Sequence, residues 1–161
     1  MLEWKITVVT PKLRYEKVRL RATMKAAGTE IIQVTRKLIK SGAKTGRRYR
    51  RWKGGPWYTA SAPGQAPADR TGQLVYIMEN KVYRNGMTVN IREGAPYAWI
   101  LEHGRNSPKR QAIRKGKKVG VAIGLAPRPS LTAALKQRGP AIERRIYDSV
   151  ALDLKFVRVK P

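Results

Sequence analysis

The fold is decided by the stretch Leu20-Arg-Ala-Thr-Met-Lys-Ala-Ala-Gly-Thr-Glu-Ile-Ile-Gln-Val-Thr-Arg-Lys-Leu38. Its apolar residues recur at alternating spacings of four and three, and cations occupy the opposite side. This period predicts an amphipathic helix over residues 16–41, closed by Gly42. A glycine inside a helix costs about 1 kcal/mol relative to alanine. We therefore interpret Gly28 as a place where another element approaches closely.

Strands are expected on both sides of this helix. Residues 2–9 alternate between apolar and polar, which predicts a half-buried strand. Residues 74–84 and 87–92 are rich in β-branched residues and flank Asn85-Gly86, the strongest short signal for a type I′ hairpin. A change of alternation between Ile77 and Val82 suggests a bulge.

The C-terminal half predicts further short elements. Residues 96–103 read as a helix between Pro96 and Gly104, and residues 119–123 as a strand that closes the sheet. A helix capped by Ser130 runs to Arg138, and Gly139-Pro140 ends it and begins another. The expected fold is a single α+β domain of residues 1–161. In it a small antiparallel or mixed sheet packs against a long N-terminal amphipathic helix and C-terminal helices.

Two segments fall outside this pattern. Residues 43–73 form a long Pro- and Gly-rich arm without periodicity, and loops of this length are usually functional or disordered. Residues 105–118 form a second basic loop. Candidates for facing DNA are eleven cations from the two segments: Arg47, Arg48, Arg50, Arg51, Lys53, Lys109, Arg110, Arg114, Lys115, Lys117 and Lys118. Candidates for contacts between subunits are Trp52, Trp57, Tyr58, Pro63 and Pro67.

Charge is the outlying property of the composition. Lys and Arg number 35 against 10 Asp and Glu, a formal net charge of +25. Self-repulsion of this size favours a polyanionic or counter-charged partner. Nucleic acid is the first candidate and an acidic protein surface the second, whereas no stretch suits a membrane. Residues 1–9 also lack the pattern of a secretory signal peptide, so synthesis in the cytoplasm is expected.

The chain offers little material for catalysis. It has no cysteine, and His103, its one histidine, stands beside the predicted helix end at Gly104. We find no spacing typical of metal ligands and no phosphate-binding glycine loop. We therefore expect a protein that is not an enzyme, with no catalytic residues, no metal site and no cofactor.

A series of short motifs resembles the neck and tail-completion proteins of long-tailed phages. In order they are Ser61-Ala62-Pro63-Gly64 with Pro67, Thr71-Gly72-Gln73-Leu74, Ala95-Pro96-Tyr97-Ala98, Leu101-Glu102-His103-Gly104, and Arg128-Pro129-Ser130-Leu131-Thr132-Ala133-Ala134-Leu135. The resemblance covers roughly residues 16–152. This chain departs from the family at Ser130, where members usually carry a large apolar residue, and in its more basic second loop.

The resemblance implies a structural virion protein of the head–tail connector, made in the host bacterial cytoplasm. It would form a ring, with a hexamer expected, that joins the tail to the portal vertex around the DNA channel. Its partners would be copies of itself, adjacent head-completion or adaptor proteins, tail-terminator or tail-tube proteins, and the passing double-stranded DNA. The alternative is a nonspecific nucleic-acid-binding protein of ribosomal or nucleoid type, which the basic clusters and their aromatic residues would also suit.

Overall fold

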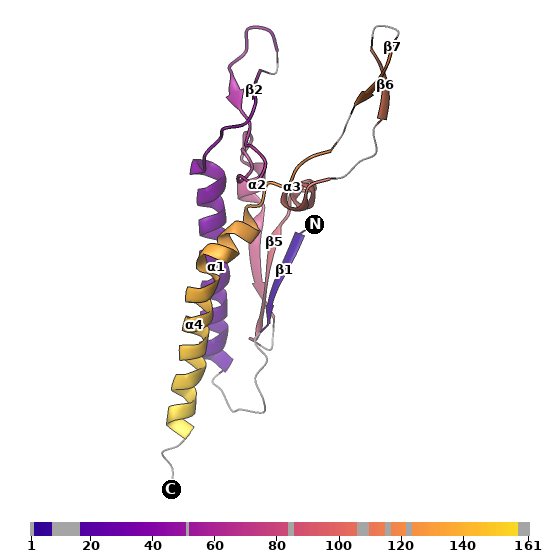
Figure 1. Ribbon diagram of the computed structural model, residues 1–161. Helices are drawn as coiled ribbons and strands as arrows, with labels where there is room; N and C mark the ends of the chain where they lie inside the picture. The colour runs from indigo at the N-terminus through magenta and orange to yellow at the C-terminus, as the bar shows by residue number, and fades with distance from the viewer. Residues whose placement is uncertain are drawn as a thin grey trace.

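The computed structural model describes residues 2–7, 17–50, 52–83, 86–105, 110–114, 117–121 and 124–157, with the backbone alone for residues 2–7, 110–114, 117–121 and 152–157. Two long helices, α1 (Lys17–Ser41) and α4 (Leu131–Val157), lie side by side (Figure 1). Helix α1 also packs on a three-stranded antiparallel sheet, whose strands lie in the order β1 (Leu2–Thr7), β5 (Thr88–Glu93) and β4 (Met78–Val82). The expected α+β fold with a long N-terminal helix is confirmed.

Helix α1 is built as its sequence predicts. Leu20, Met24 and Ile31 are fully buried, and the N–H of Gly42 donates to the carbonyl of Leu38 at 2.9 Å, which closes the helix. A Cβ on Gly28 would lie 2.9 Å from Cγ2 of Val89 in the sheet, so the predicted close approach is confirmed. Glycine is favoured there because the side chains of Val89 and Asn80 in the sheet lie directly against the backbone of the helix.

The sheet consists of β1 (Leu2–Thr7), β4 (Met78–Val82) and β5 (Thr88–Glu93). The expectation of a strand beginning at Leu74 is wrong. A turn of helix, α2 (Gln73–Tyr76), precedes β4, and the N–H groups of Val75 and Tyr76 both donate to the carbonyl of Gly72. The change of alternation that suggested a bulge is therefore the boundary between α2 and β4. Short apolar runs do not distinguish a strand from a buried helical turn.

The β4–β5 hairpin is present, but its turn differs from the predicted one. The N–H of Gly86, whose φ is 73°, donates to the carbonyl of Tyr83 at 2.9 Å. In the predicted type I′ turn the corresponding bond would run from the N–H of Met87 to the carbonyl of Arg84, one residue later. Arg84 and Asn85 lie outside the described residues. A glycine in the left-handed region at this place is typical of hairpin loops longer than two residues.

The second basic loop contains a hairpin of β6 (Arg110–Arg114) and β7 (Lys117–Val121). The expectation that residues 119–123 close the main sheet is wrong, because β7 pairs with β6 in a separate two-stranded sheet. Pairing within one hairpin closes a much shorter loop than pairing with a distant strand, so it costs less chain entropy. A bridge between Arg105 and Leu125 joins the two ends of this segment.

The C-terminal helix is continuous, so the expected break at Gly139-Pro140 is also wrong. Pro140 lies inside α4. A proline in a helix interior costs about 3 kcal/mol, since one backbone hydrogen bond is lost. Leu131 before it and Ile142 and Ile146 after it are all buried in the same core, which supplies the compensating packing.

Candidate functional site

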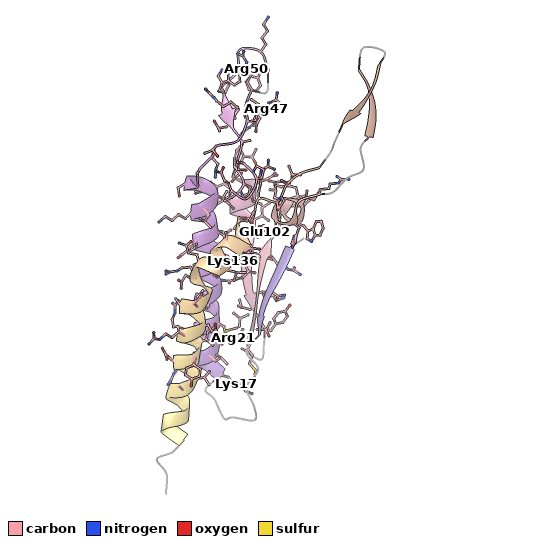
Figure 2. The ribbon with its side chains drawn as sticks, viewed as in Figure 1. Lys17, Arg21, Arg47, Arg50, Glu102 and Lys136 are labelled. Atoms are coloured by element: carbon pink, nitrogen blue, oxygen red, sulfur yellow. The ribbon has the colours of Figure 1, made fainter. Side chains whose placement is uncertain are left out.

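The first basic segment forms a projecting hairpin of β2 (Arg48–Tyr49) and β3 (Tyr58–Thr59), which we call the β2–β3 arm (residues 47–59). It extends beyond the end of α1, and Arg47 and Arg50 lie on it (Figure 2). The guanidinium carbons of Arg50 and Arg48 lie 4.6 and 5.4 Å from the ring centre of Trp57. Such cation–π contacts contribute about 0.5–1 kcal/mol each at exposed sites. The arm thus orders its own cations around one aromatic ring.

Most of the residues that were predicted to face DNA or to form subunit contacts in residues 43–73 lie on this arm. Arg47, Arg48, Arg50 and Lys53 are exposed, whereas Arg51 lies outside the described residues. Trp52 and Trp57 are 55% and 53% exposed, which is unusual for tryptophan. Tyr58 is half-buried and Pro63 is exposed, whereas Pro67 is buried within this chain and so packs inside the subunit.

The second predicted cluster lies on the β6–β7 hairpin. Arg110, Arg114, Lys117 and Lys118 belong to its paired strands, and Lys109 and Lys115 lie outside the described residues. Both basic hairpins leave the same end of the body (Figure 1). The structure therefore gathers the two clusters at one end, on separate hairpins.

The base of the β2–β3 arm is tied to the body by hydrogen bonds that backbone carbonyls accept, at what we call the arm junction (residues 60–65, 101–105 and 125–132). The N–H of Gly64 donates to the carbonyl of Pro127 at 2.9 Å, and Nε of Arg128 donates to the carbonyl of Ser61 at 3.1 Å. The N–H of Arg128 donates to the carbonyl of Leu101 at 2.6 Å. The segment of residues 43–73 thus has an anchored base and a projecting tip, rather than one continuous extended loop.

A side chain completes this anchoring. Oε1 of Gln65 accepts from the N–H groups of Ala62 at 2.9 Å and Thr45 at 3.1 Å. Nε2 of Gln65 donates to the hydroxyl of Thr45 at 2.8 Å. One glutamine therefore joins the outgoing and returning chains of the arm.

Glu102 of α3 (Ala98–His103) caps α4 across a sequence distance of about thirty residues. Its Oε1 accepts from the N–H of Thr132 at 2.6 Å, and its Oε2 accepts from the N–H of Ser130 at 2.8 Å. The side chain is buried. The first N–H groups of a helix lack partners within it and favour a negative charge. Ser130, which we expected to cap α4 with its own side chain, instead donates its backbone N–H to Glu102.

A second buried carboxyl group lies against this cap. Oε1 of Glu93 is 3.1 Å from the hydroxyl of Ser130, which in turn is 3.4 Å from Oε2 of Glu102. Burial, and then the charge of Glu102, raise the pKa of Glu93 to about 7, against the opposing effect of the Ser130 hydrogen bond. A protonated Glu93 can donate to Ser130 while Ser130 donates to Glu102, so the arrangement suits one proton on Glu93.

Two neighbouring exposed apolar residues outside the basic segments were missed by the sequence reasoning. Tyr76 is 77% exposed and Ile77 44%, and we call this pair the aromatic shoulder. A cleft of about 430 Å³ begins at Tyr76 and Ile77 and is flanked by Glu79. Tyr76 and Ile77 were read as residues of a strand, and only the short helix α2 turns them outward.

The described residues contain no group of three or more His, Cys, Asp or Glu side chains placed to hold a metal ion. Among them, too, no helix combines the length and apolarity that crossing a membrane requires. No protein-family model, no curated protein and no solved structure matches this chain. The resemblance to the neck proteins therefore stays a prediction, which rests on the motifs and on the geometry above.

Proposed function

We propose that this chain is a structural virion protein of the head–tail connector of a long-tailed phage. It forms a ring that joins the tail to the portal vertex around the DNA channel. The observation that carries the proposal is the arm junction. Three of the motifs that resemble the family, those at Ser61, Leu101 and Arg128, meet there and hold the base of the β2–β3 arm. A ring-forming subunit needs this kind of part, because an arm contacts a neighbour only if it leaves the body in a defined direction.

The exposed aromatic residues supply material for contacts between subunits. Trp52 and Trp57 on the arm and Tyr76 on the shoulder are each more than half exposed. Large aromatic side chains are the usual anchors of protein interfaces. In a closed ring one surface of a subunit meets a different surface of the next, so the arm of one copy would meet the body of its neighbour. Other partners in the proposal are head-completion or adaptor proteins, tail-terminator or tail-tube proteins, and double-stranded DNA.

The test is electron microscopy of particles produced with the gene disrupted. We expect filled heads and free tails in place of joined virions, and normal joining on complementation with the unaltered chain. Complementation with Arg47, Arg48, Arg50 and Arg51 all changed to Gln tests the arm. Joined particles that retain less DNA would indicate a role in the channel, and unjoined heads would indicate docking to another ring. Normal tailed particles in the absence of the chain would refute the proposal.

The alternative is a nonspecific nucleic-acid-binding protein of ribosomal or nucleoid type. The observation in its favour is the pair of arginines held over Trp57 on an exposed hairpin, since cations beside aromatic rings suit binding to a nucleic-acid backbone and bases. Light scattering after size exclusion, combined with particle analysis, separates the two. A monomer that binds DNA tightly and is missing from purified virions would favour the alternative.

A further inference from the structure

The two layers of the body differ in charge. Helix α1 carries seven Lys and Arg and one Glu, and α4 carries five Lys and Arg and three acids, so their net charges are +6 and +2. The strands β1, β4 and β5 together carry three cations and three acids, a net charge of zero. A polyanion that approaches the body therefore meets an attractive field on the helical side.

We infer that the outward face of the α1–α4 layer is a binding surface for the phosphate backbone of double-stranded DNA, separate from the two basic hairpins. We call it the helical face and define it by the exposed cations Lys25, Lys37 and Lys40 of α1 together with Arg138 and Arg145 of α4. The inference deepens the proposed function and rests on it for the identity of DNA as the partner. It orients the subunit, with the helical face toward the DNA channel.

The cations of α1 lack carboxylate neighbours one turn away along their own helix. Lys25 has Arg21 four residues before it and Thr29 four residues after it, and Lys40 follows Arg36 and Lys37. Cations spaced by three or four residues repel one another on a helix. An external anion relieves this repulsion.

The helix dipole explains the position of only some of the Lys and Arg residues of α1. Lys37 and Lys40 lie near the C-terminal end of α1, where cations are favourable. Lys17 and Arg21, however, lie in the first turns, where cations are unfavourable, and the first turn has no acid (Figure 2). Cations therefore line α1 from end to end, independently of what stabilises the helix.

A shallow groove lies between the two helices. It holds about 800 Å³ and is open to the surface, with the small side chains of Ala22 and Ala26 along it. Charged groups of both helices also line it: Lys25, Glu30, Arg138 and Arg145. Small side chains allow close approach, and three cations against one carboxylate leave a net attraction for phosphate.

Glu30 orients the two arginines of the groove. It accepts from Nε of Arg138 at 2.7 Å and from the guanidinium of Arg145. The hydrogen bond from Arg145 is the main reason that the pKa of Glu30 lies below its ordinary value. Arg138 and Arg145 are both about half exposed, so each guanidinium keeps N–H groups directed to solvent. Orienting a long side chain beforehand reduces the entropy lost when it binds.

The test compares two single variants of the full chain with equal loss of charge. Lys25→Gln alters the helical face, and Lys81→Gln alters an exposed cation of β4 that lies outside the helical face, the two basic hairpins and the arm junction. The probe is a fluorescently labelled random-sequence duplex, titrated by anisotropy over a range of salt concentrations. Each lost phosphate contact lowers the slope of log K against log salt by about 0.9. We expect the slope to fall by about 0.9 for the helical-face variant and to stay unchanged for the control.

Three outcomes would overturn the inference. Equal loss in both variants would show that total charge matters and location does not. An unchanged slope in the helical-face variant, with a loss in Arg47→Gln/Arg48→Gln, would confine DNA contact to the arm. Weaker binding to poly-glutamate with unaltered binding to the duplex would assign the surface to an acidic protein. Because these titrations need no ring, they leave the connector proposal to the particle images, so the two ideas can fail separately.

Discussion

Replacing Glu93 by Gln changes how the stability of this protein depends on pH. Burial and the charge of Glu102 raise the pKa of the Glu93 carboxyl group from its ordinary value of 4.5 to about 7 in the folded protein. The folded state therefore binds a proton more tightly than the unfolded chain. The contribution of the protonated Glu93 carboxyl group to the unfolding free energy is fully present below the unfolded pKa of 4.5. It is lost as the pH rises through the folded pKa of about 7.

The size of the effect follows from this difference in pKa. One pKa unit corresponds to about 1.36 kcal/mol, so ionising Glu93 in place costs about 3 kcal/mol of unfolding free energy above neutral pH. The glutamine side chain introduced by Glu93→Gln has the same shape, stays neutral and still has an N–H to donate to Ser130. We expect the variant and the unaltered chain to be similar near pH 4 and the variant to be about 3 kcal/mol more stable near pH 8. For a chain of this size that gain raises the melting temperature by about 6–12 °C.

The assay is urea denaturation followed by circular dichroism across this range of pH, with Glu79→Gln as the matched control. Glu79 is exposed on β4, next to the strand that carries Glu93. Its substitution should change the unfolding free energy by less than about 0.5 kcal/mol at every pH. If the difference between the Glu93→Gln variant and the unaltered chain does not grow as the pH rises, Glu93 is not a buried, neutral carboxyl group and the reasoning is refuted.

Three further predictions test the packing. Glu102→Ala should lower the unfolding free energy by about 2–4 kcal/mol, because the first N–H groups of α4 lose a buried acceptor, and a loss below about 1 kcal/mol in urea denaturation would contradict the capping role. Gly28→Ala should lower the unfolding free energy by about 1–3 kcal/mol, because the new Cβ meets Val89. The control Gly139→Ala, with nothing within 4 Å of its new Cβ, should raise the unfolding free energy by up to about 1 kcal/mol. Equal melting temperatures for the two variants would show that α1 lies farther from the sheet. Gly86→Val should lower the melting temperature, since a β-branched residue is strained at a φ of 73°, and an unchanged melting temperature would show that the turn tolerates another conformation.

The amino-acid sequence alone determined the elements whose signals are local. The apolar period and Gly42 gave α1 to within a residue, and the β-branched runs around Gly86 gave the β4–β5 hairpin. The two basic segments and the aromatic residues of the arm were also evident, because composition needs no fold to be recognised. These features depend on hydrophobic periodicity and backbone preference, which act over a few neighbouring residues.

Tertiary structure alone decided the features that depend on distant segments. Pro140 is a strong local signal for a helix end, yet burial of Leu131 and Ile146 in one core keeps α4 continuous. Nothing in the spacing of Glu93, Glu102 and Ser130 indicates that they meet, since strand, helix and helix start come together only in the packed fold. The free energy of burying apolar surface and satisfying buried polar groups is summed over the whole core, so it outweighs a local preference of a few kcal/mol.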